Sequence, residues 1–230
     1  MSLSHSPQIT TSGLVYCLDA ANLKSYSGSG ATWGDLATNN DATLQNSPTY
    51  NTTNNGYLSF TSAGSKYATS ATPGNLSTWT VEALVRFTAS YSSKVSMVIG
   101  GAYDLVSKLN FTIGTNNAPT NYNIAVGFFD GSWRSTTGVA YATNTWVHIT
   151  GTYDGAAVKQ FTNGSQVQSL SYAGTPASGG QIRINRRWDD VVSVGNLFDT
   201  DIGVIRVYNR ALSNTEIQQN FNATRGRYGL

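Results

Sequence analysis

Carboxylates are the first side chains to test for chemistry, because two of them together can hydrolyse a glycosidic bond. A retaining mechanism places its acid and its nucleophile about 5–5.5 Å apart, a spacing that residues two apart on one strand satisfy. Asp199 and Asp201 alone are two apart, and they lie at the turn that enters the last predicted strand. Glu82 lies on a predicted strand between Thr80 and Leu84, so it has no acidic neighbour on its own face. These positions predict no hydrolase active site.

Nucleophilic catalysis would need a base, and the chain has only two histidines. His5 lies in the polar N-terminal segment, whereas His148 alternates with apolar residues in a predicted strand, which favours a structural role. Cys17 lies inside a short apolar run and is expected to be a small core residue rather than a reactive thiol. The chain has no CxxC, HExxH, Walker or GxGxxG motif. We therefore expect a protein that is not an enzyme.

Two short segments combine a tryptophan with arginines and aspartates. The segment RRWDD holds Arg186, Arg187, Trp188, Asp189 and Asp190. The segment DGSWR holds Asp130, Trp133 and Arg134. In a sugar site an aromatic ring stacks on the apolar face of the sugar while polar groups fix its hydroxyls. Tryptophan and arginine are equally typical of protein contacts, so both clusters are candidate sites for either kind of ligand.

Calcium is the one metal that the residue types allow, because its ligands are the oxygens of Asp, Asn and backbone carbonyls. Asp189 and Asp190 are the candidates, with Asp104 and Asp130 as more remote options. No DxDxDG-like spacing supports them. Apart from this possible calcium ion, the sequence predicts no cofactor.

The elements that position these residues are predicted to be short strands. In TWTVEALVRF, residues 78–87, apolar and polar residues alternate with the period of two of a half-buried strand. Asp154-Gly155 and Asn163-Gly164 separate three further alternating runs, which indicates antiparallel hairpins. Residues 213–216, Ser-Asn-Thr-Glu, form a capping box that predicts one short helix ending near residue 221. About a dozen strands and one terminal helix predict an all-β sandwich of two antiparallel sheets.

Composition agrees with that fold and excludes several classes of protein. The charged residues make up 11% of the chain and the net charge is +2, without a basic stripe that would indicate nucleic-acid binding. No apolar run approaches the length of a membrane span. The first residues have neither the basic nor the apolar region of a secretory signal. We expect an N-terminal arm at residues 1–12 and one domain at residues 13–230.

Three segments of the sequence resemble one known family. The segment NTWVHITGTYDGAAVKQFTNGSQV, residues 144–167, is similar to a segment of laminin-G-like domains of the concanavalin A-like lectin/glucanase superfamily. The ending LFDTDIGVIRVYNRALSNTEIQQNF resembles the last strand, turn and helix of that family. The opening GLVYCLDAAN, followed by SYSGSGATWGDL, looks like the start of the members found in bacteriophage structural proteins. The resemblance implies a jelly-roll sandwich, a fold that serves many functions.

A jelly roll with one cysteine and no secretory signal is what we expect of a virion protein made in a bacterial cytoplasm. The sequence therefore predicts a non-enzymatic structural or decoration protein on the capsid or tail of a bacteriophage. Other virion proteins would be its partners, it would self-associate, and residues 1–12 would attach it. The alternative is a carbohydrate-binding lectin or receptor-binding module for host surface glycans, and a third option is an unrecognised glycoside hydrolase.

Overall fold

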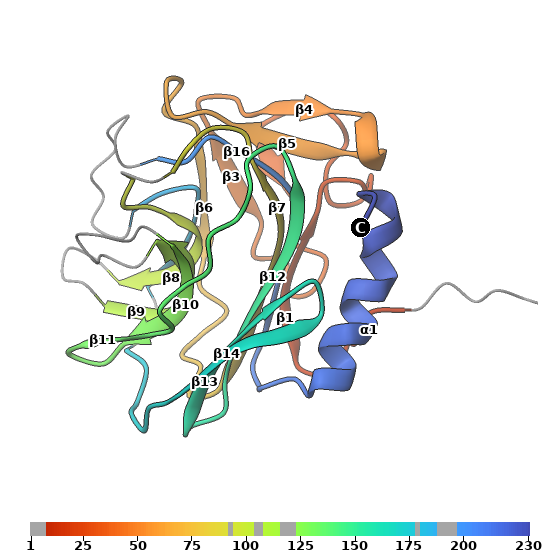
Figure 1. The fold of residues 1–230 in the computed structure, drawn as a ribbon. Helices are drawn as coiled ribbons and strands as arrows, with labels where there is room; N and C mark the ends of the chain where they lie inside the picture. Colours follow the sequence, from red (N-terminus) through yellow and green to blue (C-terminus); the bar gives the residue numbers. More distant parts are fainter. Residues whose placement is uncertain (1–7, 92–93, 104–107, 116–122, 178–179, 188–196) are drawn as a thin grey trace, which may run out of the picture.

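The computed structural model describes residues 8–91, 94–103, 108–115, 123–177, 180–187 and 197–230 (Figure 1). The strands have these bounds: β1 Leu14–Asp19, β2 Thr32–Trp33, β3 Ala42–Gln45, β4 Thr49–Asn51, β5 Tyr57–Phe60, β6 Tyr67–Ala71, β7 Trp79–Phe87, β8 Met97–Tyr103, β9 Lys108–Thr115, β10 Ile124–Phe129, β11 Trp133–Ser135, β12 Trp146–Tyr153, β13 Ala157–Thr162, β14 Ser165–Ser171, β15 Gln181–Ile184 and β16 Thr200–Tyr208. The helix α1 is Asn214–Thr224, and single turns of 3₁₀ helix cover Thr53–Asn55 and Arg225–Arg227.

In the described part of the chain the strands form two antiparallel sheets, as the sequence predicts. Sheet A has the order β14-β13-β12-β7-β16-β5-β4, with β1 paired to the second half of β16. Sheet B has the order β11-β10-β9-β8-β15-β6-β3-β2. The two sheets face each other, and aromatic and branched aliphatic side chains fill the space between them. The expected all-β jelly-roll sandwich is therefore confirmed.

The predicted hairpins follow from their turn residues. Asn163 and Gly164 both have positive φ, 50° and 78°, which is the backbone that a two-residue turn between twisted strands requires. In the segment after β1, Trp33 is fully buried, whereas Leu36 points outward with an exposed fraction of 41%. Asp35 takes the inward position instead, and its carboxylate accepts hydrogen bonds from the backbone N–H groups of Cys17 and Ala37.

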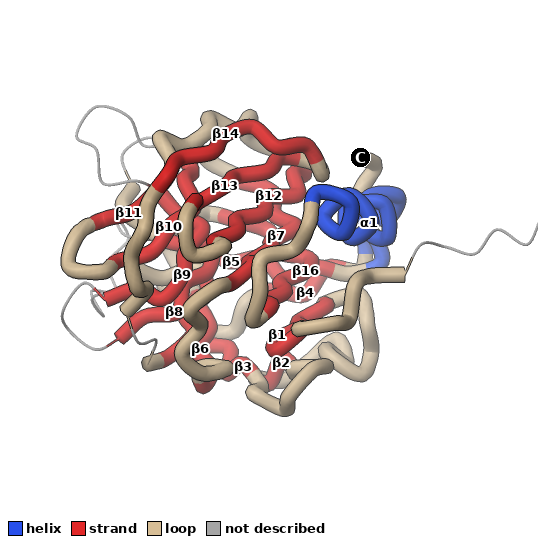
Figure 2. The backbone as a smooth tube through the Cα atoms, turned by 90° about the horizontal axis from the view of Figure 1, so that it is seen from below, coloured by secondary structure: helices blue, strands red, loops and turns tan. Residues whose placement is uncertain are grey.

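The helix α1 covers the outer face of sheet A (Figure 2). Its N-terminus has the predicted capping box, because the Ser213 hydroxyl accepts from the backbone N–H of Glu216 and the Glu216 carboxylate accepts from that of Ser213. Ile217 and Phe221 face the sheet and are buried. No helix among the described residues is long and apolar enough to span a membrane.

The described end of the N-terminal arm, residues 8–12, lies against α1. The backbone N–H of Thr10 donates to Asn220 Oδ1 at 2.8 Å, and the Tyr208 hydroxyl donates to the carbonyl of Thr10 at 3.0 Å. The Gln219 side chain donates to the carbonyl of Gln8 at 2.6 Å. Residues 8–12 therefore lie beside α1, on the side away from β8–β11 (Figure 1).

Cys17 is 5% exposed in β1, which confirms its predicted place in the core. Burial raises the pKa of its thiol to about 11, so at neutral pH the thiol is protonated. Because the thiolate is the reactive form, we expect a thiol reagent such as DTNB at pH 8 to modify the folded protein roughly a hundredfold more slowly than the urea-unfolded protein. Equal rates in the two states would contradict this assignment.

Candidate binding sites

The predicted cluster around Trp133 is assembled at the tip of the hairpin that joins β10 to β11. Arg134 Nε lies 3.0 Å from Asp130 Oδ2, and Trp133 is 37% exposed. Phe129 meets Trp133 edge to face, with the ring centroids 5.6 Å apart. The Arg134 guanidinium lies 5.7 Å from the ring centroid of Tyr172. We call Phe129, Asp130, Trp133, Arg134 and Tyr172 the hairpin-tip cluster.

The hairpin-tip cluster is held by its neighbours on both sides. The backbone N–H of Ser132 donates to Asp130 Oδ1 at 3.2 Å, which closes the turn. The hydroxyl of Tyr172 donates to the carbonyl of Ser135 at 3.3 Å, and the backbone N–H of Ala177 donates to the carbonyl of Phe129 at 2.9 Å. Three aromatic rings, one cation and one carboxylate are thereby brought together. This combination suits a ligand with an apolar face and hydroxyl groups.

The described residues of the second predicted cluster, Arg186 and Arg187, lie at the other end of sheet B. Arg186 and Arg187 come directly after the last residue of β15. Because β10 runs antiparallel to β15, the hairpin tip that follows β10 lies at the end of the sheet where β15 begins. The Arg186 guanidinium lies 4.5 Å from the ring centroid of Tyr67. Trp188, Asp189 and Asp190 lie outside the described residues. The described residues of the two predicted clusters therefore do not form one site.

The acids tested above for hydrolysis are held in ion pairs. Asp201 pairs with Arg86 at 2.6 Å, and Asp199 pairs with Lys94 at 2.9 Å. Burial opposes ionisation of Asp199, but Lys94 and Ser62 hold the pKa of its carboxyl below the ordinary value. Glu82 lies under α1 in a buried network. Among the described residues, each of these three acids is therefore held by interactions with neighbouring side chains.

His148 has a structural role, as the sequence predicts, but its ring is held by packing and not by hydrogen bonds. Its ring is 1% exposed and stacks on Phe221, with the centroids 5.9 Å apart. Its Nε2 lies 3.9 Å from Glu82 Oε2, which is beyond hydrogen-bond distance. Within the described ranges, no group of three or more His, Cys, Asp or Glu side chains could hold a metal ion. The predicted calcium ligands Asp189 and Asp190 lie outside those ranges.

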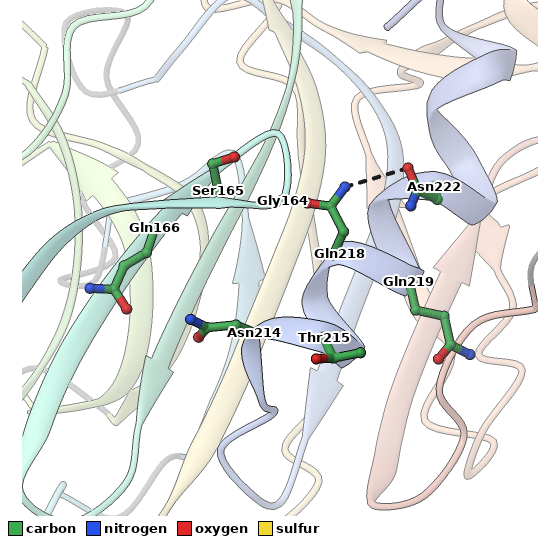
Figure 3. Close-up of a pocket in the computed structure, with 8 residues that line it drawn as sticks. All are labelled: Gly164, Ser165, Gln166, Asn214, Thr215, Gln218, Gln219 and Asn222. Carbon is green, nitrogen blue, oxygen red and sulfur yellow. Dashed lines mark hydrogen bonds between the residues drawn. The ribbon is translucent and has the colours of Figure 1, made fainter.

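Two hollows among the described residues are further candidate sites, and the sequence analysis predicts neither of them. A groove of about 660 Å³ runs between the start of β14 and α1, and it is lined by side-chain amides of Gln166, Asn214, Gln218, Gln219 and Asn222 (Figure 3). A Cβ atom on Gly164 would lie 2.8 Å from Oε1 of Gln218, whose side-chain amide would have to shift. This amide groove can form hydrogen bonds but presents no aromatic ring. A pocket of about 450 Å³ is lined by Tyr26 and Tyr50, among other residues.

Sequence patterns gave only partial signals for these residues. Asp130, Trp133 and Arg134 lie within five positions of one another, so their hairpin brings them together. Tyr172 comes from the loop after β14, and no local pattern links it to them. The run SYSGSG, which wraps around Tyr26, is the one signal that could have indicated the second hollow, because closely spaced glycines allow a tight loop.

Known structures share this fold at low sequence identity. The binding domain of a paraclostridial mosquitocidal protein 1 is similar over 92% of this chain and 52% of its own, with 15% identity and a TM-score of 0.70. The binding domain of botulinum neurotoxin DC in complex with rat synaptotagmin II gives 12% identity and a TM-score of 0.68 over 92% of this chain and 52% of its own. The same binding domain in complex with SialylT gives 13% identity, the same coverage of both chains and a TM-score of 0.66. At these identities the likeness concerns the fold, and the chain spans about half the length of these structures.

The sequence comparison is more specific about ancestry. No curated protein matches the chain. Residues 53–218 match the sequence profile of a laminin-G-type family in the concanavalin A-like lectin/glucanases superfamily. This range is well over half of the chain and contains both the central strand β7 and the start of α1. By this match and by its jelly-roll fold, the chain belongs to the concanavalin A-like lectin/glucanases superfamily.

Proposed function

We propose that the chain is a non-enzymatic binding module that recognises a carbohydrate through the hairpin-tip cluster. The observation that carries the proposal is the exposed Trp133 beside the Arg134–Asp130 pair. A sugar ring can stack on the indole, while the guanidinium and carboxylate form hydrogen bonds with its hydroxyls. Structures of the same fold include a binding domain in complex with SialylT and one in complex with synaptotagmin II, which supports a binding role.

The position of the hairpin-tip cluster suits this role. The cluster lies at the edge of sheet B, whereas α1, the described arm and the C-terminus lie on the opposite side of the molecule (Figures 1 and 2). A module attached through its arm would therefore present the hairpin tip outward. Asp199 and Asp201 are held by Lys94 and Arg86, which supports binding without hydrolysis.

Replacing Trp133 by alanine tests the proposal. We expect the wild-type protein to bind a subset of a glycan array and the Trp133→Ala variant to bind the same glycans roughly tenfold or more weakly, because about 1.4 kcal/mol of stacking corresponds to tenfold in affinity. Leu23→Ala is the control, since Leu23 is 75% exposed in the loop between β1 and β2. No binding across the array, or equal binding by both variants, would overturn the proposal.

The predicted place in a bacteriophage virion stays a prediction, as do the virion proteins expected as partners and the expected self-association. The docking of residues 8–12 beside α1 is compatible with attachment through the arm. Mass spectrometry of purified phage particles would decide virion membership. Removal of residues 1–7 keeps the docked part of the arm, so full incorporation of the shortened protein would exclude those seven residues as the attachment point.

A further inference from the structure

The pocket at Tyr26 and Tyr50 has the composition of a small-ligand site. It is lined by Tyr26, Leu44, Pro48 and Tyr50, of which only Tyr50 is partly exposed, and by the hydroxyl-bearing Ser29 and Ser47. The ring centroids of the two tyrosines are 5.3 Å apart and their planes make an angle of 55°. None of its lining residues is charged. We call this hollow the tyrosine pocket.

One wall of the tyrosine pocket is a loop that is fixed before any ligand binds. The Tyr26 hydroxyl donates to the carbonyl of Gly30 at 3.1 Å, which folds the loop back over the ring. Gly28 and Gly30 have φ values of 97° and 96°, a backbone that side chains rarely allow. The backbone N–H of Leu44 donates to the carbonyl of Ala31 at 2.7 Å and ties the loop to β3.

The facing wall is a strained turn between β3 and β4. Asn46 and Ser47 are consecutive residues with φ values of 58° and 51°, in the left-handed region that disfavours residues other than glycine. The Asn46 side chain donates to the carbonyl of Ser65 at 2.8 Å and holds the turn in place. The turn places Ser47 at the wall of the pocket.

We propose that the tyrosine pocket is a second carbohydrate site that takes one neutral sugar unit. Its volume of about 450 Å³ lies within the range of small-ligand sites. The partly exposed Tyr50 ring offers an apolar surface to the sugar ring, the serine hydroxyls offer donors and acceptors, and the uncharged lining favours a ligand without charge. The inference rests on the proposed carbohydrate binding, and it makes the chain bivalent.

The two sites lie at opposite edges of sheet B. The hairpin-tip cluster follows β10 and β11 at one edge, and the tyrosine pocket is bounded by β3 and the loop before β2 at the other. One short glycan therefore cannot occupy both sites. A surface with many glycans can occupy both, and a second site on the same chain raises the apparent affinity for such a surface.

The test is an NMR titration of the ¹⁵N-labelled chain with glucose, galactose, mannose, N-acetylglucosamine and N-acetylgalactosamine, each up to about 50 mM, which detects Kd values in the millimolar range. At least one sugar should shift the amide signals of Gly28, Ser29, Gly30 and Ser47. We expect Tyr50→Ala to abolish these shifts and Asn214→Ala, in the amide groove, to leave them unchanged. No shift in the pocket with any of the sugars would overturn the proposal.

A second variant separates lost binding from lost folding. Ser47→Gly removes a hydroxyl from the pocket and also relieves the left-handed strain, so the variant should keep its thermal stability while the sugar-induced shifts shrink at least severalfold. Unchanged shifts in both Ser47→Gly and Tyr50→Ala would contradict the pocket assignment. Trp133→Ala should leave the shifts intact. The NMR titration shows whether the tyrosine pocket binds a sugar, and the glycan array shows whether the hairpin-tip cluster does. The two proposals can therefore fail independently.

Discussion

Replacing Arg206 by methionine is expected to lower the free energy of unfolding by about 3–5 kcal/mol, because it leaves a buried carboxylate without its cation. Arg206 Nη1 lies 3.2 Å from Glu82 Oε2, and both side chains are 3% exposed or less. Asn220 donates to both carboxylate oxygens at 3.0 and 3.1 Å. Burial by itself would raise the pKa of Glu82, but His148, Arg206 and Asn220 lower it below the ordinary value. Glu82 therefore stays ionised and needs its partners.

Urea unfolding at pH 7 measures this effect, and the reciprocal change supplies the control. Glu82→Gln should also destabilise strongly, because it leaves the Arg206 guanidinium buried without an anion. A double variant, Glu82→Leu with Arg206→Met, removes both charges and should be more stable than the Arg206→Met variant alone. A cost below about 1 kcal/mol for Arg206→Met, as is usual for an exposed ion pair, would show that the network contributes little.

The same network shows where sequence reasoning about the fold reaches its limit. Alternation in residues 78–87 correctly predicts a strand, and it also predicts that one face of the strand is solvated. In the structure eight of the nine residues of β7 are buried, and Glu82 and Thr80 on the outer face are among them. The cover comes from α1, more than a hundred residues later in the chain. A local pattern gives the period of a strand but does not report which distant element covers it.

Whether a strand or helix can be predicted from the sequence depends on its length and on the residue types of the adjoining turns. The sequence predicts β7, the hairpin strands β12, β13 and β14, and the capped helix, because their periodicity and their Asp-Gly, Asn-Gly or Ser-x-x-Glu signals are local. The short strands β2, β3, β4, β6 and β11 were not predicted. Strand β4, for example, is the three residues TYN, which are too few to show a period. Such strands form because they pair with an existing sheet edge.

The candidate sites show the same difference between residues that are close in the sequence and residues that only the fold brings together. The Asp130–Arg134 pair was accessible to sequence reasoning, because one hairpin contains both residues. The tyrosine pocket joins Tyr26 to Tyr50 across two loops, and only the packing of β3, β4 and the SGSG loop brings them together. Contact between loops depends on the register of the strands that they connect. Register is a property of the whole sheet, so this pocket could not be predicted from local spacing.

Gly203→Ala is expected to destabilise the protein by about 2–4 kcal/mol, although a glycine-to-alanine change within a strand ordinarily stabilises by roughly 0.5–1 kcal/mol. Gly203 lies in β16 where the register with β7 shifts, between Ile202 and Val204. A Cβ atom at this position would overlap with the hydroxyl and ring of Tyr228. Tyr228 would then lose its hydrogen bond to the carbonyl of Gly56, 3.2 Å long, and its packing on Trp146.

The double-mutant comparison decides whether the contact with Tyr228 is the cause. In a Tyr228→Ala background the added methyl group has space, so Gly203→Ala should cost less than about 0.5 kcal/mol there, as at an uncrowded position. Equal costs in the two backgrounds would place the strain in the backbone of β16 instead. Tyr228 packs with Tyr57 and Trp146 on the outer face of sheet A. A smaller cost of Gly203→Ala in the Tyr228→Ala background would therefore also show that the C-terminal residues stabilise this face and do not merely cover it.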